Sequence, residues 1–289
     1  MATYGEFVKR NAGYIASDVQ EKIRHTRVLI AGCGMGSTVP EAMLRAGFLN
    51  LALADGDRVE VHNLNRQNYV FDDVGTPKVD ALKKRLAAVS PLANITAHNG
   101  WIGPGNAAAL VADADLVFDT IDFISLGAIV ALHDECRRQR KPVISALSAG
   151  FGAAALYFPP DAACSFRDIF GLPAAGDVEG FSYVERFGGL MVRLADQLEP
   201  DVVQAMAGAL KVMEDGTPCP APHTSSGALC AAALGTAIAV RMLAGKPVAA
   251  APRLILLNMS DILTGGIDLM EDVALPVDES VADPASRAA

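Results

Sequence analysis

The stretch Arg27-Val28-Leu29-Ile30-Ala31 runs directly into Gly32-Cys33-Gly34-Met35-Gly36-Ser37, and this junction is the strongest indication of the fold class. The first five residues form a short apolar run typical of a buried strand, and residues 38–48 have apolar positions at helical spacing. Glycines between a strand and a helix let the backbone approach a phosphate at the helix N-terminus. The order strand, glycine turn, helix therefore predicts a nucleotide-binding α/β unit.

Strands and helices alternate along the following hundred residues. The sequence predicts strands over 51–54, 95–97, 115–118 and 142–146, with helices over 77–89 and up to about Arg138. It then predicts a strand over 151–158, a loop over 159–180, helices over 183–213, a loop over 215–226 and a late strand over 253–258. We expect an α/β fold with a Rossmann-like, doubly wound, mostly parallel sheet, helices on both faces and a C-terminal mixed-sheet extension.

The length of 289 residues fits one such domain with additions. We expect a single domain over residues 1–275, with a nucleotide-binding core over about 26–150 and a part for substrate and dimer contacts over about 151–275. The acidic, then Ala- and Ser-rich residues 276–289 are expected to be a disordered tail.

Composition narrows the classes of function. Apolar residues make up 51% of the chain and charged residues 20%, which favours a globular protein with a large core. The formal charge of −9 argues against a nucleic-acid partner. Five cysteines without a CxxC pair, and no export signal at the N-terminus, indicate a cytoplasmic protein. The apolar run over 227–240 is shorter than the about 20 residues that span a bilayer, so we expect a buried helix and no membrane partner.

A nucleotide site follows from the glycine turn and one carboxylate. Gly32, Gly34, Gly36 and Ser37 are the candidate phosphate-binding residues, although their spacing departs from G-x-G-x-x-G and a plain tight turn is the alternative. Asp55 ends the next predicted strand, about 20 residues on, where a carboxylate binds the ribose hydroxyls of an adenine nucleotide. These residues would serve ATP or a nicotinamide dinucleotide equally well.

Three further motifs distinguish these alternatives. They are His62-Asn63-Leu64-Asn65-Arg66-Gln67-Asn68, Gly75-Thr76-Pro77-Lys78 and Asp119-Thr120-Ile121-Asp122. In order and spacing they resemble the NLxRQ, GxPKV and D-x-x-D motifs of the ThiF/MoeB/HesA family, which includes the adenylation domains of ubiquitin-activating enzymes. The resemblance covers about residues 8–160 and extends more weakly to about Gly245.

The resemblance implies an adenylyltransferase that uses ATP and Mg²⁺ to activate a carboxylate. Arg66 would bind the triphosphate, Lys78 would stabilise charge at the α-phosphate, and Asn63 and Gln67 would orient phosphate or ribose. Asp122 would hold Mg²⁺, which prefers oxygen ligands beside substrate phosphates. The alternative without a nucleotide makes Arg66 part of a surface salt bridge, Lys78 the exposed start of a helix and Asp122 a helix N-cap.

The resemblance also implies partners. Arg10 matches a family arginine that reaches across a homodimer into the partner's nucleotide site, while an ordinary surface arginine is the alternative. Family substrates include ubiquitin-like carrier proteins ending in Gly-Gly, and peptides; a small molecule is a further alternative.

The chain departs from the family pattern at several positions. It lacks the two CxxC pairs that hold zinc in many members, so zinc is not expected. Its glycine turn is one residue shorter, and Phe123 stands where Asn is common. Cys219, with His223 nearby in sequence, is a candidate catalytic thiol that would take the activated acyl group or form a persulfide, and a passive loop cysteine is the alternative.

Two other classes of function stay open at this point. A NAD(P)-linked oxidoreductase would use the same glycines and Asp55, but it leaves Arg66, Lys78 and Asp122 unexplained, and we find no YxxxK in the expected region. A non-catalytic partner subunit of an activating enzyme is the second, and the intact set of Arg, Lys and Asp argues against it.

Overall fold

The computed structural model describes residues 3–122, 125–178, 180–214 and 222–265. The chain divides into two compact units, residues 1–258 and 259–289. The first unit carries the whole sheet and every described residue with a predicted functional role. In the second unit, the described part is the helix α11 (Met259–Gly265).

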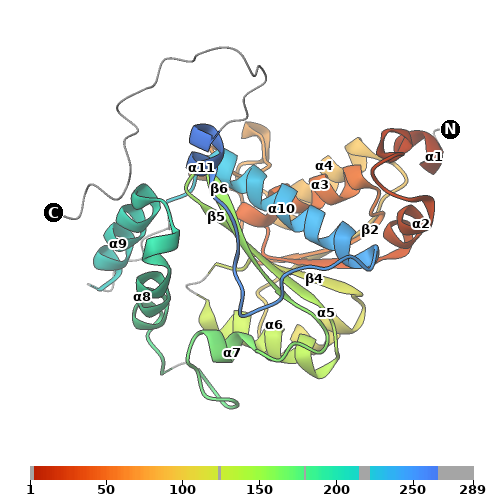
Figure 1. Ribbon diagram of the computed structural model, residues 1–289. Helices are drawn as coiled ribbons and strands as arrows, with labels where there is room; N and C mark the ends of the chain where they lie inside the picture. The colour runs from red at the N-terminus through yellow and green to blue at the C-terminus, as the bar shows by residue number, and fades with distance from the viewer. Residues whose placement is uncertain (1–2, 123–124, 179, 215–221, 266–289) are drawn as a thin grey trace, which may run out of the picture. The chain divides into compact units, whose positions relative to one another are not determined.

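A seven-stranded sheet in the order β3-β2-β1-β4-β5-β6-β7 organises the first unit (Figure 1). Its strands are β1 (Arg27–Ala31), β2 (Asn50–Asp55), β3 (Asn94–Asn99), β4 (Leu116–Asp119), β5 (Val143–Ala149), β6 (Gly152–Phe158) and β7 (Ile255–Leu257). The strands from β3 to β5 are parallel, and β6 pairs antiparallel with both β5 and β7. This confirms the predicted doubly wound sheet with a mixed C-terminal extension.

Helices cover both faces of this sheet. The helices described in the first unit are α1 (Tyr4–Phe7), α2 (Ser17–His25), α3 (Thr38–Ala46), α4 (Lys78–Val89), α5 (Ala107–Ala112), α6 (Leu126–Arg138), α7 (Phe166–Ile169), α8 (Tyr183–Leu194), α9 (Pro200–Glu214) and α10 (Ser225–Leu243). Figure 1 shows α3, α4 and α10 on one face and α5, α6 and α7 on the other. Successive side chains of β1 point to opposite faces of the sheet. Val28 and Ile30 belong to the hydrophobic core under α3, α4 and α10, and Leu29 and Ala31 belong to the core under α5, α6 and α7.

The structure corrects the prediction of a loop over residues 159–180. This segment contains α7 and is packed against α6, with the side chains of Phe166 and Arg167 buried. Arg167 Nη2 donates to Asp134 Oδ2 at 2.8 Å, and its Nε lies 3.0 Å from both carboxylate oxygens. The Pro- and Gly-rich composition of the segment favoured a loop, but tertiary contacts stabilise a short helix within it. Helices α2 and α5 were also not predicted, because one is mostly polar and the other has only six residues.

Helix α10 is longer than the apolar run that predicted it. With 19 residues it is long and apolar enough to cross a membrane by length and composition alone, so the argument from shortness was wrong. In the structure it packs on β5, β6 and α3 through small residues. A Cβ at Gly235 would lie 2.6 Å from Cε1 of Phe118, so the glycine permits the close approach of helix and sheet. The apolar composition of α10 thus has a packing explanation.

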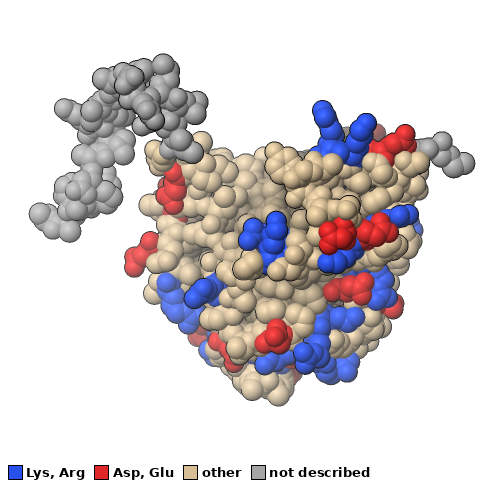
Figure 2. Space-filling model, turned by 45° about the vertical axis from the view of Figure 1, so that its right-hand side comes forward, with Lys and Arg blue, Asp and Glu red and all other residues tan. Residues whose placement is uncertain are grey.

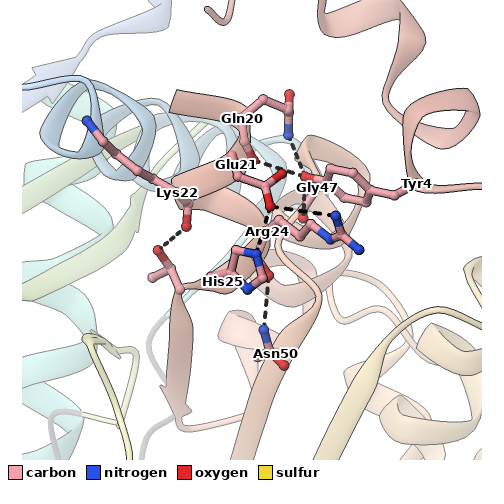
Figure 3. A network of polar contacts seen from close by, with 9 residues as sticks. Tyr4, Gln20, Glu21, Lys22, Arg24, His25, Gly47 and Asn50 are labelled. Atoms are coloured by element: carbon pink, nitrogen blue, oxygen red, sulfur yellow. Dashed lines mark hydrogen bonds and ion pairs between the residues drawn. The ribbon is translucent and has the colours of Figure 1, made fainter. Parts of the chain in front are cut away.

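The N-terminal segment is fixed by polar contacts that tie α1 and α2 to the C-terminal end of α3 (Figure 3). Tyr4 Oη donates to the carbonyl oxygens of Gly47 and Gln20 at 3.0 and 3.2 Å, and Gln20 Nε2 donates back to Tyr4 Oη at 2.8 Å. The Arg24 guanidinium lies 5.0 Å from the centroid of the Tyr4 ring. The segment that carries Arg10 is therefore held at the end of α3 opposite to the glycine turn.

Candidate nucleotide site at the carboxyl edge of the sheet

The glycine turn lies between β1 and α3, as predicted, and packs against Thr120 at the end of β4. Thr120 Oγ1 donates to the carbonyl oxygens of Gly32 and Ala31, at 2.7 and 3.0 Å. Gly32 has a φ of 90°, and a Cβ at Gly32 or Gly36 would collide with Thr120. These two glycines are required for the contact between the turn and β4, which leaves Gly34 as the glycine that faces the rest of the site.

Asp55 ends β2 and shapes the same turn. Its Oδ2 accepts the Cys33 amide at 2.6 Å, and its Oδ1 accepts the Asp57 amide at 2.7 Å. The carboxylate is half-buried, and each oxygen retains acceptor capacity beyond these bonds. Asp55 therefore stands where the sequence predicts the ribose-binding carboxylate, and it also holds the turn in place.

Lys78 starts α4 and is buried at the same edge. Its Nζ lies 2.7 Å from Asp57 Oδ2, and its amide donates to the Asp57 carbonyl oxygen at 2.9 Å. The Lys78 side chain is 7% exposed, while that of Asp57 is 47% exposed. The sequence analysis did not identify Asp57, although its position two residues after Asp55 could have indicated it.

The segment with Asn63 and Gln67 is fastened beside the glycine turn. Asn63 is buried and accepts the Glu60 amide through Oδ1 at 3.0 Å. Ser37 is also buried, and its hydroxyl accepts the Asn68 amide at 2.8 Å. Ser37 thus connects the turn to this segment. Gln67 lies against Gly34, since a Cβ there would be 3.6 Å from Gln67 Nε2.

Arg66 is half-buried and is partly held by its own segment. Its Nη1 donates to the His62 carbonyl oxygen and to Asn65 Oδ1, both at 2.9 Å. Desolvation lowers the pKa of the guanidinium, and the negative charge of Asp122 opposes that shift. Arg66 and Asp122 are therefore close enough to interact electrostatically.

A buried polar cluster beneath the site supports the turn that carries Asp122. Asp119 Oδ2 accepts the Ser145 hydroxyl at 3.0 Å and lies 2.9 Å from His133 Nε2, while Asp119 Oδ1 accepts the Ile121 amide at 3.2 Å. All three side chains of the cluster are buried. The sequence analysis missed His133 and Ser145, because a lone polar residue in an apolar helix or strand gives no pairing signal.

One predicted residue, Arg10, is not brought to the edge within one copy of the chain. Arg10 is exposed in the short helical turn Lys9–Asn11, whose Asn11 donates to the Ala46 carbonyl oxygen at 3.0 Å, at the far end of α3. Cys219 lies outside the described residues. His223 precedes α10, whose N-cap Thr224 donates to the Gly150 carbonyl oxygen.

No group of three or more His, Cys, Asp or Glu side chains suited to a metal ion occurs within the ranges that the structure describes. Asp122 is exposed and stands as a single candidate ligand. That arrangement fits an ion held mainly by phosphate oxygens and water, as Mg²⁺ commonly is.

Figure 2 shows one face of the molecule, on which basic and acidic side chains are interspersed at the right and along the bottom. On this face they form no continuous basic stripe of the kind that binds a phosphate backbone. The exclusion of a nucleic-acid partner stays a prediction.

Comparisons with known proteins agree with this geometry. The ThiF family profile matches residues 8–261. The molybdopterin-synthase adenylyltransferase of Escherichia coli is 35% identical over 130 residues, which is 44% of this chain and 51% of that protein. The vegetative HesA protein of Trichormus variabilis is 28% identical over 179 residues, 61% of this chain and 67% of that protein. The match thus spans only about half of the first relative's length.

Solved structures share the fold. The crystal structure of E. coli MccB with ATP has a TM-score of 0.59 at 20% identity and covers 83% of this chain and 66% of MccB. The structure of PaaA has the same TM-score at 19% identity and covers 89% of this chain and 67% of PaaA.

Proposed function

Because the chain belongs to the ThiF family, we propose that it binds ATP at the carboxyl edge of its sheet and adenylates a carboxylate. Relatives carry the names of adenylyltransferases for molybdopterin synthase and for sulfur carrier proteins. The carboxylate would be the C-terminus of a ubiquitin-like carrier protein or a peptide, with a small molecule as the alternative.

One observation carries the proposal. Among the described residues, Nε of Arg66 and Oε1 of Gln67 are buried without a hydrogen-bond partner. A buried polar atom left unpaired costs about 1–3 kcal/mol. Gln67 lies against Gly34 and Arg66 is its neighbour in sequence, so these two atoms support a polar ligand beside the glycine turn. Asp55 and Gly34 border the same region, which is where a Rossmann-like fold holds a nucleotide.

The charges suit adenylation. A carboxylate oxygen attacks the α-phosphorus, the bond from that phosphorus to the bridging oxygen breaks, and pyrophosphate leaves with the electron pair. Negative charge accumulates in this step, and Lys78 and Arg66 are the cations placed to stabilise it. Mg²⁺ bound to the phosphates would neutralise further charge, and Asp122 is the residue that would hold it. Asn63 and Gln67 would orient the nucleotide.

We further propose a homodimer in which Arg10 acts on the partner's site. Within one copy, Asn11 and Tyr4 anchor the Arg10 segment to the far end of α3. An arginine fixed at that end of the helix would contact a nucleotide in the site of a second copy. Exposed apolar side chains in the same segment and in residues 61–74, including Tyr14 and Phe71 at 92% and 72%, support a protein contact.

For the step after adenylation, Cys219 is proposed as the acceptor of the acyl group. The thiolate would attack the carboxyl carbon of the acyl adenylate, and AMP would leave. Direct attack by an external nucleophile is the alternative, because a carboxyl adenylate is already activated.

The test is a thermal-shift comparison of ATP with Mg²⁺ against NAD(P)(H). Saturation at 100 times the dissociation constant should stabilise the protein by about 2.7 kcal/mol. A larger shift with NAD(H) would favour the oxidoreductase. ATP binding without any carboxylate-dependent pyrophosphate exchange would favour a non-catalytic partner subunit.

A further inference from the structure

A single exposed tryptophan stands next to the carboxylate proposed to bind ribose. Trp101 follows β3, and it is the one tryptophan of the chain. Its side chain is 68% exposed. Large exposed aromatic side chains carry a hydrophobic cost and commonly mark a binding surface. The position of Trp101 relative to the nucleotide site therefore indicates which ligand it would contact.

The pairing of β2 with β3 brings Trp101 to this place. Asp55 is the register partner of Asn99, and the Gly100 amide donates to the Asp55 carbonyl oxygen at 3.1 Å. Gly100 is thus the residue opposite Gly56, and Trp101 follows one residue later, beyond the end of the sheet, with its ring against Gly56. The Trp101 carbonyl oxygen accepts from Asn106 Nδ2 at 2.9 Å, which fixes the backbone at this position.

The indole lies with a face against Gly56. A Cβ built on Gly56 would be 2.7, 2.8 and 3.0 Å from Cδ2, Cε2 and Cγ of Trp101, which are atoms from the middle of the ring system. Contact with the edge of the ring would bring peripheral atoms closest instead. Any side chain at position 56 would displace the indole. The glycine thus lets the ring lie flat on the backbone with its other face open to solvent.

We propose that the open face of Trp101 stacks on the adenine of the bound nucleotide. This inference rests on the proposed function, because it requires ATP at the edge of the sheet with its ribose at Asp55. The base is bonded directly to that sugar, and Trp101 is an aromatic surface two residues beyond Asn99, the strand partner of Asp55. An aromatic face binds any base, so Trp101 supplies affinity for the base rather than recognition of adenine alone.

The sole tryptophan gives a direct assay. Excitation of tryptophan fluorescence reports on residue 101 alone, so ATP binding should change the emission of the wild-type protein, while tripolyphosphate should not. By calorimetry, Trp101→Ala should weaken ATP binding by about 5- to 150-fold, the range for loss of one aromatic–base stack. Trp101→Phe should stay close to wild type. Tripolyphosphate, which has no base, should bind wild type and Trp101→Ala equally.

Two variants control for a merely structural effect. Gly56→Ala should weaken ATP binding in the wild-type background but not in Trp101→Ala, because its effect acts through the indole. Phe151→Ala removes an aromatic of similar exposure, 60%, from the turn between β5 and β6 and should leave ATP affinity unchanged.

The outcomes separate the two proposals. ATP binding that is equally tight in wild type and Trp101→Ala would overturn the stacking role and leave the proposed function standing. No ATP binding by the wild-type protein in calorimetry would overturn both.

Discussion

The Nζ of Lys78 lies 2.7 Å from Oδ2 of Asp57, and the backbone of the same two residues is joined by a hydrogen bond of 2.9 Å. The proposed catalytic cation is thus held by a carboxylate before any nucleotide arrives. Because Lys78 is buried and Asp57 is half-exposed, the carboxylate can turn toward solvent more easily than the ammonium can. ATP binding would therefore exchange one anionic partner of Lys78 for another.

Asp57→Asn should separate stability from affinity. The variant leaves a buried ammonium without its ion-pair partner, so the free energy of unfolding should fall by about 1–3 kcal/mol. It also removes one negative charge beside the proposed triphosphate site, so ATP should bind about 3- to 10-fold more tightly. Chemical denaturation and calorimetry measure the two effects. Asp80→Asn, on the exposed first turn of the same helix, is the control and should change neither. Weaker ATP binding by Asp57→Asn would contradict this account of the pair.

Arg10→Ala and Lys78→Ala should complement each other if the site is shared between copies. Each variant alone should lose most of its pyrophosphate exchange, with Lys78→Ala down by about 100- to 1,000-fold. Mixed dimers contain one site with both cations, so unfolding and refolding an equal mixture should restore about a quarter of wild-type exchange. Lys9→Ala, the exposed neighbour, should behave as wild type. A mixture no more active than its components would place Arg10 outside the partner's site.

Glu41 should make stability depend on acid pH. Its Oε2 accepts from Asn68 Nδ2 and Arg85 Nε, both at 2.6 Å, and its Oε1 accepts from Arg45 Nη2 at 2.8 Å. Burial raises the pKa of this carboxyl, but the hydrogen bonds from Asn68, Arg85 and Arg45 outweigh it and lower the pKa to about 2 from an ordinary 4.5. A lowered folded-state pKa gives stability that is fully present above about pH 4.5 and is lost as the pH falls toward 2.

The corresponding measurement is urea unfolding of wild type and Glu41→Gln across that window. The difference in the free energy of unfolding should be up to about 3 kcal/mol at neutral pH and should shrink below pH 4.5. Glu185→Gln, at an exposed glutamate on α8, removes the same charge elsewhere and is the control; its free energy of unfolding should stay close to that of the wild type. A difference between wild type and Glu41→Gln that is constant from pH 7 to pH 3 would contradict the prediction.

Cys219→Ala should separate adenylation from transfer. The variant should retain carboxylate-dependent exchange of pyrophosphate into ATP and lose the thiol-bound acyl intermediate, which mass spectrometry detects. Asp122→Ala should instead lose exchange itself, because its carboxylate is assigned to the first step. Cys164→Ala, at a half-buried cysteine shortly before α7, should retain both activities. Full product formation by Cys219→Ala would leave direct attack on the adenylate as the mechanism.

The parallel core of the fold was predictable because its signals are local. The strand of residues 27–31 was predicted with the bounds that the structure has, and the predicted helix over 77–89 differs from α4 by one residue at its start. In both elements the spacing of apolar residues is regular, and a glycine turn or a proline marks a boundary. The segment 159–180 was not predictable in this way, because α7 depends on contacts of Phe166 and Arg167 with a distant helix.

The site was predictable as a set of residues but not as a set of contacts. Sequence motifs placed Asp55, Arg66, Gln67 and Lys78 on consecutive segments, and the fold brings those segments to one edge. The pairing of Lys78 with Asp57, and the support of Asp119 by His133 and Ser145, join residues from different strands and helices. Trp101 was missed for the same reason, because the pairing of β3 with β2 brings it near Asp55.

The edges of the sheet have a consequence for how copies of this protein associate. β3 forms one edge, and its alternate residues Asn94, Thr96 and His98 are polar, while the other edge, β7, has only three residues. Polar and very short edge strands resist edge-to-edge pairing, which is a common route to fibrous aggregation. A chain built in this way should resist polymerising by extension of its sheet, so that a homodimer of the kind proposed would form through helical and loop surfaces.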